Sequence, residues 1–207
     1  MQKLMPDASV FGGTSNNIKQ HQTRSIKQTK SMNIAVYCSA KDVIPEEYLV
    51  LGDALGRWIG EHGHTLVYGG ATGGLMTRVS DAAKVAGAHV IGVIPPRIKA
   101  AGRLAHNCDE LIEVANMAER KQRMRETADC FICLPGSYGT LDEMMDVLAS
   151  GTVGEHRKPL YVLNHRGFYD DLKHLAAHMR ELRFLPKEES YKPIYVDSLE
   201  EIYQMIH

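Results

Sequence analysis

Short apolar runs alternate with amphipathic stretches along most of this chain, and this alternation constrains its fold more than any other feature. The first runs read NIAVYCS (33–39), HTLVYGG (64–70) and HVIGVIP (89–95). They are apolar without a regular polar alternation, as strands of a parallel sheet buried on both faces require. We therefore predict an α/β fold, a Rossmann-like doubly wound parallel sheet of about seven strands with helices on both faces.

The same pattern continues through the rest of the chain. Further strands are predicted at 110–116, 129–136, 159–164 and 193–197. Helices are predicted over 45–61, 74–87, 117–128, 140–151, 168–182 and 198–207, with a long polar loop between 96 and 109. Ligands of such folds bind beyond the carboxyl ends of the strands, so we expect the function to lie in the strand-to-helix loops.

The formal net charge of -1 combines two unlike segments. Residues 1–31 carry five basic side chains and one acidic one, so this segment is +4 and residues 32–207 are -5. The first segment is rich in Gln, Ser, Thr and Lys and has no apolar periodicity, which predicts a disordered basic tail before a single domain over 32–207. Its composition is typical of an organelle transit peptide or of an upstream extension before a start at Met32, and we favour the extension.

Charge and hydropathy also restrict the partners. The 24 basic and 25 acidic side chains nearly balance, which argues against a nucleic-acid partner held by charge. No stretch of about 18 apolar residues occurs, so we expect no membrane partner and a cytoplasmic location.

The four cysteines do not suggest a metal or redox site. Only Cys130 and Cys133 form a CxxC, and it lies inside a predicted strand, where positions three apart point to opposite faces. We predict reduced, structural thiols. The ten histidines form no HExxH pattern, so no metal site is expected.

A first glycine-rich segment, YGGATGGLM (68–76), follows a predicted strand and opens a predicted helix. Gly69, Gly70 and Gly73 would allow a close approach to a ligand, and the helix N-terminus offers free amides to an anion or a ribose. A tight turn whose glycines serve only packing explains the pattern equally well. Ser39, in the loop after the first predicted strand, is a further substrate-binding candidate.

A second segment, LPGSYGTLDE (134–143), is more informative. Pro135 ends a strand, Gly136 and Gly139 free the backbone, and Ser137 and Thr140 add hydroxyl groups before a helix. Such a loop is suited to binding a phosphate.

Two carboxylates, Asp142 and Glu143, are expected in the first turn of the helix after this loop. They either interact favourably with the helix dipole or act on the sugar attached to a bound phosphate. The basic cluster Arg120, Lys121, Arg123 and Arg125 lies on one predicted helix and would normally face solvent. Arg120 and Lys121 can serve one site only near the start of that helix.

The chain has no GxGxxG after its first strand and no GxxxxGK[ST], which disfavours hydride transfer from NAD and ATP hydrolysis. Instead GGATGGLM (69–76), MAERK (117–121) and PGSYGTLDE (135–143), in this order, resemble the LOG (Lonely Guy) family. Its members are cytokinin riboside 5'-monophosphate phosphoribohydrolases, often labelled "possible lysine decarboxylase". The resemblance extends from about Met32 to the C-terminus.

The resemblance implies a homodimeric hydrolase without a cofactor. It would cleave the N-glycosidic bond of a nucleoside 5'-monophosphate, either a cytokinin riboside monophosphate or an AMP-like nucleotide, to a free base and ribose 5-phosphate. Arg120 and Glu143 would be catalytic, since a carboxylate can stabilise positive charge on the ribose and a guanidinium can offset charge on the departing base. The implied substrate-binding residues are Lys121, Asp142 and the loop Gly136, Ser137, Tyr138, Gly139 and Thr140.

The chain departs from the family pattern at three positions. Ala118 stands where the family usually has His, Ser137 replaces a loop Gly, and Arg103 begins RLAH where ELAH is common. These changes affect the choice of base more than the reaction, so AMP or another phosphorylated riboside is a candidate substrate.

The fold and the phosphate loop also allow a function without catalysis. A non-catalytic carrier of a nucleotide or phosphorylated cofactor, with the same fold, is the alternative, and the retained Arg120 and Glu143 favour an enzyme. No lysine is marked as a Schiff-base residue, which disfavours decarboxylation.

Overall fold

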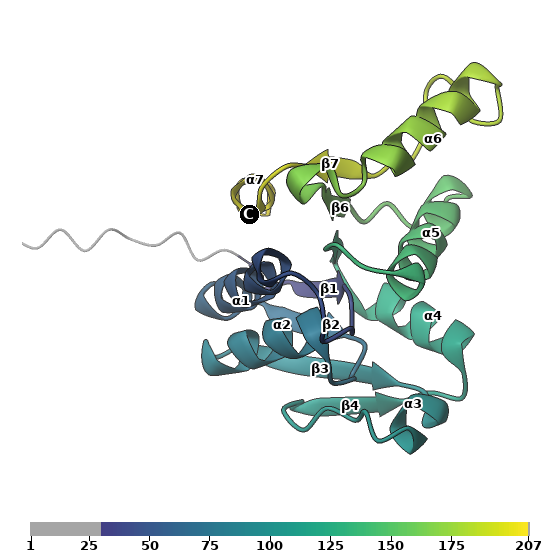
Figure 1. Cartoon of the computed structure of the whole chain (residues 1–207). Coiled ribbons are helices and arrows are strands. Elements are labelled where there is room, and N and C mark those ends of the chain that lie inside the picture. Colours follow the sequence, from purple (N-terminus) through teal and green to yellow (C-terminus); the bar gives the residue numbers. More distant parts are fainter. Residues whose placement is uncertain (1–29, 207) are drawn as a thin grey trace, which may run out of the picture.

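Residues 30–206, the part of the chain that our computed structural model describes, form one sheet of seven parallel strands (Figure 1). The strands are β1 (Asn33–Tyr37), β2 (Thr65–Tyr68), β3 (His89–Ile94), β4 (Glu110–Glu113), β5 (Cys130–Cys133), β6 (Leu160–Leu163) and β7 (Ile194–Val196). Their order in the sheet is β4-β3-β2-β1-β5-β6-β7. The predicted fold class is confirmed, while the tail predicted over 1–31 lies outside the described residues except for its last two.

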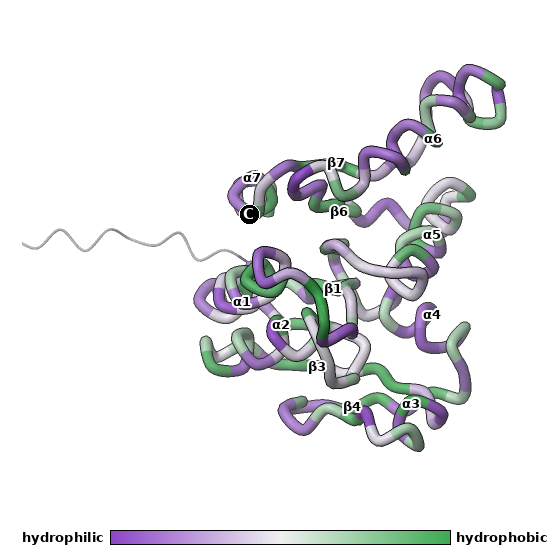
Figure 2. The backbone as a smooth tube through the Cα atoms, viewed as in Figure 1, coloured by the Kyte–Doolittle hydropathy of each residue, from purple (hydrophilic) through white to green (hydrophobic). Residues whose placement is uncertain are grey.

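Helices cover both faces of this sheet. They are α1 (Glu46–Glu61), α2 (Gly74–Val85), α3 (Pro96–Ala100), α4 (Met117–Thr127), α5 (Tyr138–Thr152), α6 (Asp170–Glu181) and α7 (Leu199–Met205), with a 3₁₀ turn η1 (His165–Gly167). Leu55 of α1 and Leu75 of α2 pack in one apolar cluster with β1 and β2, whereas Met124 of α4 and Met144 of α5 pack on the opposite face. Hydrophilic and hydrophobic stretches alternate along α1 (Figure 2), as expected for a helix with one apolar face packed on the sheet.

Among the predicted boundaries that differ from the structure, two lie near the candidate site. The long loop predicted between 96 and 109 begins with the short helix α3, whose first residue is Pro96, a position that proline favours. Helix α5 begins at Tyr138 rather than Thr140, because Leu141 N–H already donates to the carbonyl of Ser137, at 3.0 Å. Asp142 and Glu143 therefore lie in the second turn of the helix, not in the first.

The two cysteines of the CxxC point to opposite faces of β5, as predicted. Cys130 belongs to the cluster under α1 and α2, and Cys133 to the cluster under α4 and α5. All four cysteines are free thiols. Burial raises the pKa of both Cys130 and Cys133 to about 12, so neither is a thiolate at neutral pH.

The four methionines of α4 and α5 beside the PGSYGT segment could pair in a homodimer, but they have two different environments. Met124 and Met144 are buried in the intrachain core, so they cannot form an interface. Met117 and Met145 are each 41% exposed. The homodimer stays a prediction, and light scattering that gives a monomer mass would contradict it. None of the helices within residues 30–206 has the length and apolar character needed to cross a membrane.

Helices α1 and α2 approach closely because α1 presents three glycines, Gly52, Gly56 and Gly60, on one face. A Cβ at Gly56 would lie 2.2 Å from the carbonyl oxygen of Val79, and one at Gly60 would lie 2.5 Å from the Cβ of Ala86. The contact at Gly52 is looser, with Arg78 Cβ at 3.0 Å. This spacing of four residues was visible in the sequence as GDALGRWIG.

We predict that Gly56→Ala destabilises the protein by about 1–3 kcal/mol, since the added methyl overpacks against backbone that cannot move aside. Gly52→Ala is the matched control, because its looser contact and its gain in helix propensity of up to about 1 kcal/mol offset each other. Urea unfolding monitored by circular dichroism measures both. Equal stability of the two variants would contradict the tight contact at Gly56.

We also predict that a thiol reagent at neutral pH modifies Cys38, Cys130 and Cys133 only after unfolding, because all three thiols are buried. The partly buried Cys108 is expected to react first. The measurement is a titration with dithiobis-nitrobenzoate before and after denaturation. Rapid loss of more than one thiol in the folded protein would contradict the burial of Cys38, Cys130 and Cys133.

Candidate functional site

The order of the strands reverses at one place in the sheet. The chain winds outward from β1 through β2, β3 and β4, and then adds β5, β6 and β7 on the other side of β1. The loops after β1 and β5 therefore diverge and leave a crevice at the carboxyl ends of these strands, where open α/β sheets bind ligands. The PGSYGT segment (135–140) lies in one of these loops and Ser39 in the other.

A cavity of about 400 Å³ lies at this crevice. Its lining comes from the loops after β1, β2 and β5, from α3 and the loop that follows it, and from the starts of α2, α4 and α5: Cys38, Ala40, Ala71, Met76, Arg97, Ile98, Ala101, Arg103, Met117, Arg120, Ser137, Gly139, Thr140 and Glu143. Arg120 and Glu143, predicted as a pair from distant parts of the sequence, meet in its wall.

Arg120 is positioned by the capped start of α4. The Asn116 side chain accepts a hydrogen bond from Glu119 N–H at 3.0 Å, which fixes the first turn of the helix. Arg120 then lies one turn inside and is 3% exposed. Its Nε donates to the carbonyl of Val93 on β3 at 3.0 Å, and its Nη1 donates to Glu143 Oε1 at 2.7 Å.

Glu143 is equally buried, at 3% exposure. Burial raises the pKa of Glu143, and the adjacent Arg120 guanidinium opposes that rise. Oε1 is held by Arg120, whereas Oε2 makes no hydrogen bond with any residue in the described part of the chain. The pair thus presents one restrained carboxylate to the cavity.

Gly69 allows Arg120 to reach this position. A Cβ at Gly69 would lie 2.0 Å from Arg120 Nη2, so any larger residue would displace the guanidinium. The other two predicted glycines serve the loop. Gly70 has φ 63° and its carbonyl accepts from Ala105 N–H at 3.0 Å, and Gly73 has φ 116° and contacts the side chain of Arg103. None of the three lines the 400 Å³ cavity.

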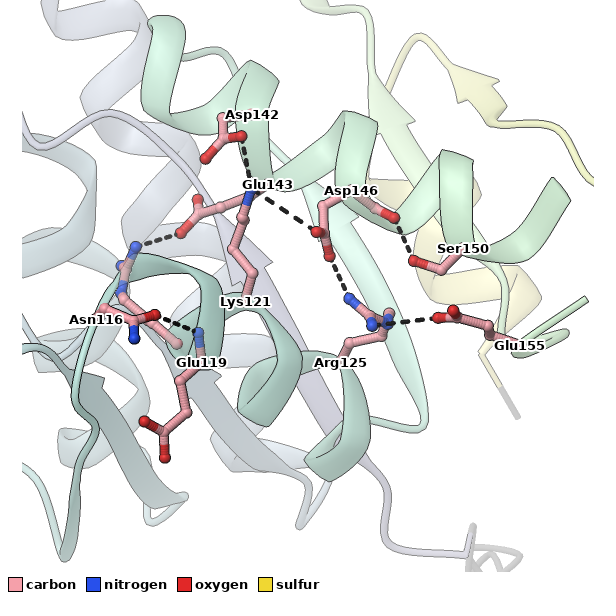
Figure 3. Close-up of polar contacts among 10 residues, drawn as sticks. Asn116, Glu119, Lys121, Arg125, Asp142, Glu143, Asp146, Ser150 and Glu155 are labelled. Atoms are coloured by element: carbon pink, nitrogen blue, oxygen red, sulfur yellow. Dashed lines mark hydrogen bonds and ion pairs between the residues drawn. The ribbon is translucent and has the colours of Figure 1, made fainter. Parts of the chain in front are cut away.

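Lys121 and Asp142 lie beside this cavity and not in its wall. Lys121 Nζ contacts Asp142 Oδ1 at 2.7 Å and Asp146 Oδ1 at 3.7 Å, and Asp146 also pairs with Arg125 (Figure 3). In Figure 3 these contacts form a ladder between α4 and α5, from which the Glu143 carboxylate points away. Of the two predicted carboxylates, only Glu143 is brought into the cavity.

The PGSYGT segment contributes three of its residues to the cavity: Ser137, Gly139 and Thr140. Ser137 is the N-cap of α5, yet its side chain makes no capping hydrogen bond. Tyr138 is 90% exposed and points elsewhere. Gly136 packs against Thr140, and the start of the segment is fixed by Tyr169, whose hydroxyl donates to the carbonyl of Leu134 at 2.8 Å.

Ser39 and Ala118 also lie outside the cavity. Ser39 is buried, its hydroxyl accepts from Lys41 N–H at 3.1 Å, and it lines a neighbouring apolar groove together with Gly136 and Ser137. Ala118, where the family usually has His, is exposed.

Sequence reasoning missed the part of the wall that α3 contributes. Arg97 and Ile98 of α3, and Ala101 just after it, close one side of the cavity. The signal that could have found them is the Pro95-Pro96 pair, since proline commonly opens a helix. Within residues 30–206, no three His, Cys, Asp or Glu side chains gather as metal ligands would.

Comparison with known proteins identifies the family. Residues 76–206 match the family described as "Possible lysine decarboxylase". A protein of Mycobacterium marinum named cytokinin riboside 5'-monophosphate phosphoribohydrolase is 38% identical over 171 residues, which cover 83% of this chain and 91% of that protein. The chain belongs to the LOG family.

Other relatives fit this assignment. The LOG protein of Oryza sativa subsp. japonica, named cytokinin riboside 5'-monophosphate phosphoribohydrolase, is 40% identical over 144 residues, which cover 70% of this chain and 60% of that protein. Among solved structures, the molybdenum cofactor binding protein of the phototrophic bacterium Rippkaea orientalis superposes with a TM-score of 0.64. The two sequences are 21% identical, and the match covers 86% of this chain and 96% of that one. At this level of identity the match shows that the two proteins share a fold and nothing more.

Proposed function

We propose that this protein hydrolyses the N-glycosidic bond of a nucleoside 5'-monophosphate and releases a free base and ribose 5-phosphate. One observation carries the proposal. A buried carboxylate, Glu143, is restrained by a buried arginine in the wall of a cavity that is also lined by the N-terminus of α5. The names of the LOG relatives support the same reaction class.

The 5'-phosphate is assigned to the start of α5. The first N–H groups of a helix have no partner within the helix, and together with the helix dipole they favour an anion. The Ser137 hydroxyl, which caps nothing, is available as a further donor. Gly139 leaves open space, since an added Cβ there would meet no atom within 4 Å.

The reaction adds water across the bond between C1' and the base nitrogen. As that bond breaks, positive charge develops on the ribose, and the Glu143 carboxylate stabilises it and orients the attacking water. The water oxygen joins C1', and a proton passes to the leaving base. Arg120 serves this step by fixing Glu143 and by offsetting the negative charge of the departing base.

Lys121 and Asp142 are given a supporting role. Because they contact each other outside the cavity, we propose that they hold α4 against α5 and so keep Arg120 and Glu143 in register. Decarboxylation through a Schiff base is disfavoured, because none of the described residues that line the cavity is a lysine.

The proposal is tested by incubating the purified protein with a panel of nucleoside 5'-monophosphates, cytokinin riboside monophosphate and AMP included, and measuring free base and ribose 5-phosphate by chromatography. Release from at least one of them is expected. Binding without release from any would favour the alternative, a carrier of a nucleotide or phosphorylated cofactor.

Glu143→Gln is predicted to lower kcat by about 1000-fold or more, because it removes the charge that stabilises the transition state. The glutamine oxygen can still accept from Arg120, so nucleotide binding should persist. Single-turnover kinetics and calorimetry measure the two quantities. A fully active variant would show that Glu143 is not catalytic.

Gly69→Ala is predicted to lower kcat by about 100-fold, since a displacement of the order of 1 Å at a catalytic group has effects of that size. Gly69 does not line the cavity, so we expect the variant to act by displacing Arg120. Gly52→Ala, in the contact between α1 and α2 and outside the cavity lining, is the matched control and should keep full activity. If Gly69→Ala keeps the wild-type kcat and a native circular dichroism spectrum, catalysis does not depend on the position of Arg120.

A further inference from the structure

Tyr169, the residue before α6, is a buried anchor whose contacts lead to the PGSYGT segment (135–140). It is 3% exposed, although none of the residues of α6 that follow it is buried. Its N–H donates to Asn164 Oδ1 at 2.7 Å, and Asn164 Nδ2 donates to Asp170 Oδ1 at 2.9 Å. These bonds tie the backbone of Tyr169 to the end of β6, which Asn164 directly follows.

The Tyr169 hydroxyl takes the place of a backbone donor at the end of β5. Leu134 N–H still donates to the Tyr37 carbonyl at 2.9 Å, as in the ladder between β5 and β1. The Leu134 carbonyl, however, accepts from no backbone N–H in the described part of the chain. The Tyr169 hydroxyl donates to it at 2.8 Å, and the Cys133 thiol is a weak second donor at 3.7 Å. Burial raises the pKa of Tyr169, so the hydroxyl keeps its proton and remains a donor at neutral pH.

The Leu134 carbonyl sets the direction in which the chain leaves the sheet. It belongs to the peptide unit between Leu134 and Pro135, which is planar, and proline then fixes the next φ near about −65°. Gly136 packs so tightly on the first turn of α5 that an added Cβ would lie 2.1 Å from Thr140 Oγ1. Because few rotations are free between Leu134 and Thr140, a shift of the carbonyl is passed on to the N-terminus of α5.

This contact acts on the phosphate position and not on the catalytic pair. A phosphate at a helix N-terminus needs several N–H groups aimed at one point, so a small shift of the segment weakens all of these bonds. Arg120 is held by the carbonyl of Val93 on β3, and Glu143 is held by Arg120. Tyr169 does not line the cavity. It therefore reaches the phosphate position through the Leu134 carbonyl and not by contact with the ligand.

We propose that Tyr169 is a positioning residue that sets the affinity of the site for the phosphate group of its ligand, a role that rests on the proposed function for the place of the phosphate. The affinity then depends on a hydroxyl outside the cavity, held by the loop after β6. Without this hydroxyl, the peptide unit between Leu134 and Pro135 turns toward other donors. The N–H groups at the start of α5 lose their alignment, while Glu143 keeps its place.

Tyr169→Phe tests this role, because it removes the hydroxyl and little volume. The ligand used is ribose 5-phosphate, which carries the phosphate without a base and whose binding is measured by calorimetry without turnover. The Kd of Tyr169→Phe is expected to be about tenfold higher than that of wild type. With the nucleotide that wild type hydrolyses fastest, KM is expected to rise by a similar factor, while kcat changes by less than about twofold.

Tyr191→Phe is the matched control. Tyr191 is also buried, and its hydroxyl also donates to a backbone carbonyl, that of Lys158 at 2.6 Å, but it does not line the cavity. Both variants are expected to unfold at lower urea concentrations than wild type, since each leaves a carbonyl without its donor. Only Tyr169→Phe is expected to weaken the binding of ribose 5-phosphate. Equal weakening in both variants, or none in Tyr169→Phe, means that the hydroxyl serves stability alone and overturns the proposal.

Asn164→Ala is a second variant, which removes the acceptor of Tyr169 N–H and decides the question if Tyr169→Phe does not fold. It is expected to raise the Kd of ribose 5-phosphate as well. The double variant should bind little more weakly than Tyr169→Phe, because both changes act through one contact. An unchanged Kd in Asn164→Ala, or fully additive effects, would contradict this route.

Failure of the role of Tyr169 differs from failure of the hydrolase proposal. If the two tyrosine variants differ in the Kd of ribose 5-phosphate as expected, the role of Tyr169 holds even when no nucleotide is hydrolysed. If wild type hydrolyses a nucleotide but does not bind ribose 5-phosphate measurably, the KM values of the two variants decide in the same way. A wild type that binds neither ribose 5-phosphate nor any nucleotide overturns the role of Tyr169.

Discussion

The buried ion pair between Arg120 and Glu143 is the constraint on which the arrangement of the site depends. Removing two charges from water costs several kcal/mol per ion, and the pair compensates this cost only when its geometry and its remaining hydrogen bonds are good. Here the guanidinium has two fixed acceptors, Val93 and Glu143, that come from different elements. Breaking such a pair from one side leaves an uncompensated charge and commonly costs about 3–5 kcal/mol.

Several local features of the chain position Arg120 and Glu143. The Asn116 cap sets where α4 begins and therefore where Arg120 points. Gly69 provides the space that the guanidinium occupies, and the early start of α5 places Glu143 in its second turn, facing inward. The salt bridge between Lys121 and Asp142 joins the same two helices on their outer side. Exposed bridges of this kind stabilise by about 0–1 kcal/mol, so it aligns the helices more than it stabilises them.

The sequence was sufficient for features that depend on periodicity or on local turn chemistry. Apolar runs without alternation predicted the parallel sheet, and the two glycine-rich segments fell at carboxyl ends of strands. Contacts between distant segments could not be read in the same way. Gly69 looked like a ligand-binding glycine, yet its neighbour is Arg120, about fifty positions along the chain. Adjacent acidic residues looked equivalent, and only the helical rotation set by the true start of α5 separates buried Glu143 from exposed Asp142.

The charge of the cavity lining is opposite in sign to the net charge of the domain. This difference affects how an anionic ligand would be recognised. Residues 32–207 are acidic overall, at -5, whereas the charged residues that line the cavity are three arginines and one glutamate. At physiological ionic strength exposed charges are screened beyond about 8 Å, so the acidic surface repels a nucleotide only weakly at a distance. Inside the crevice screening is weaker, and the arginines act at short range with fixed geometry. Recognition in the proposed function therefore depends on where Arg120 and the N-terminus of α5 are held, rather than on any overall attraction between protein and ligand.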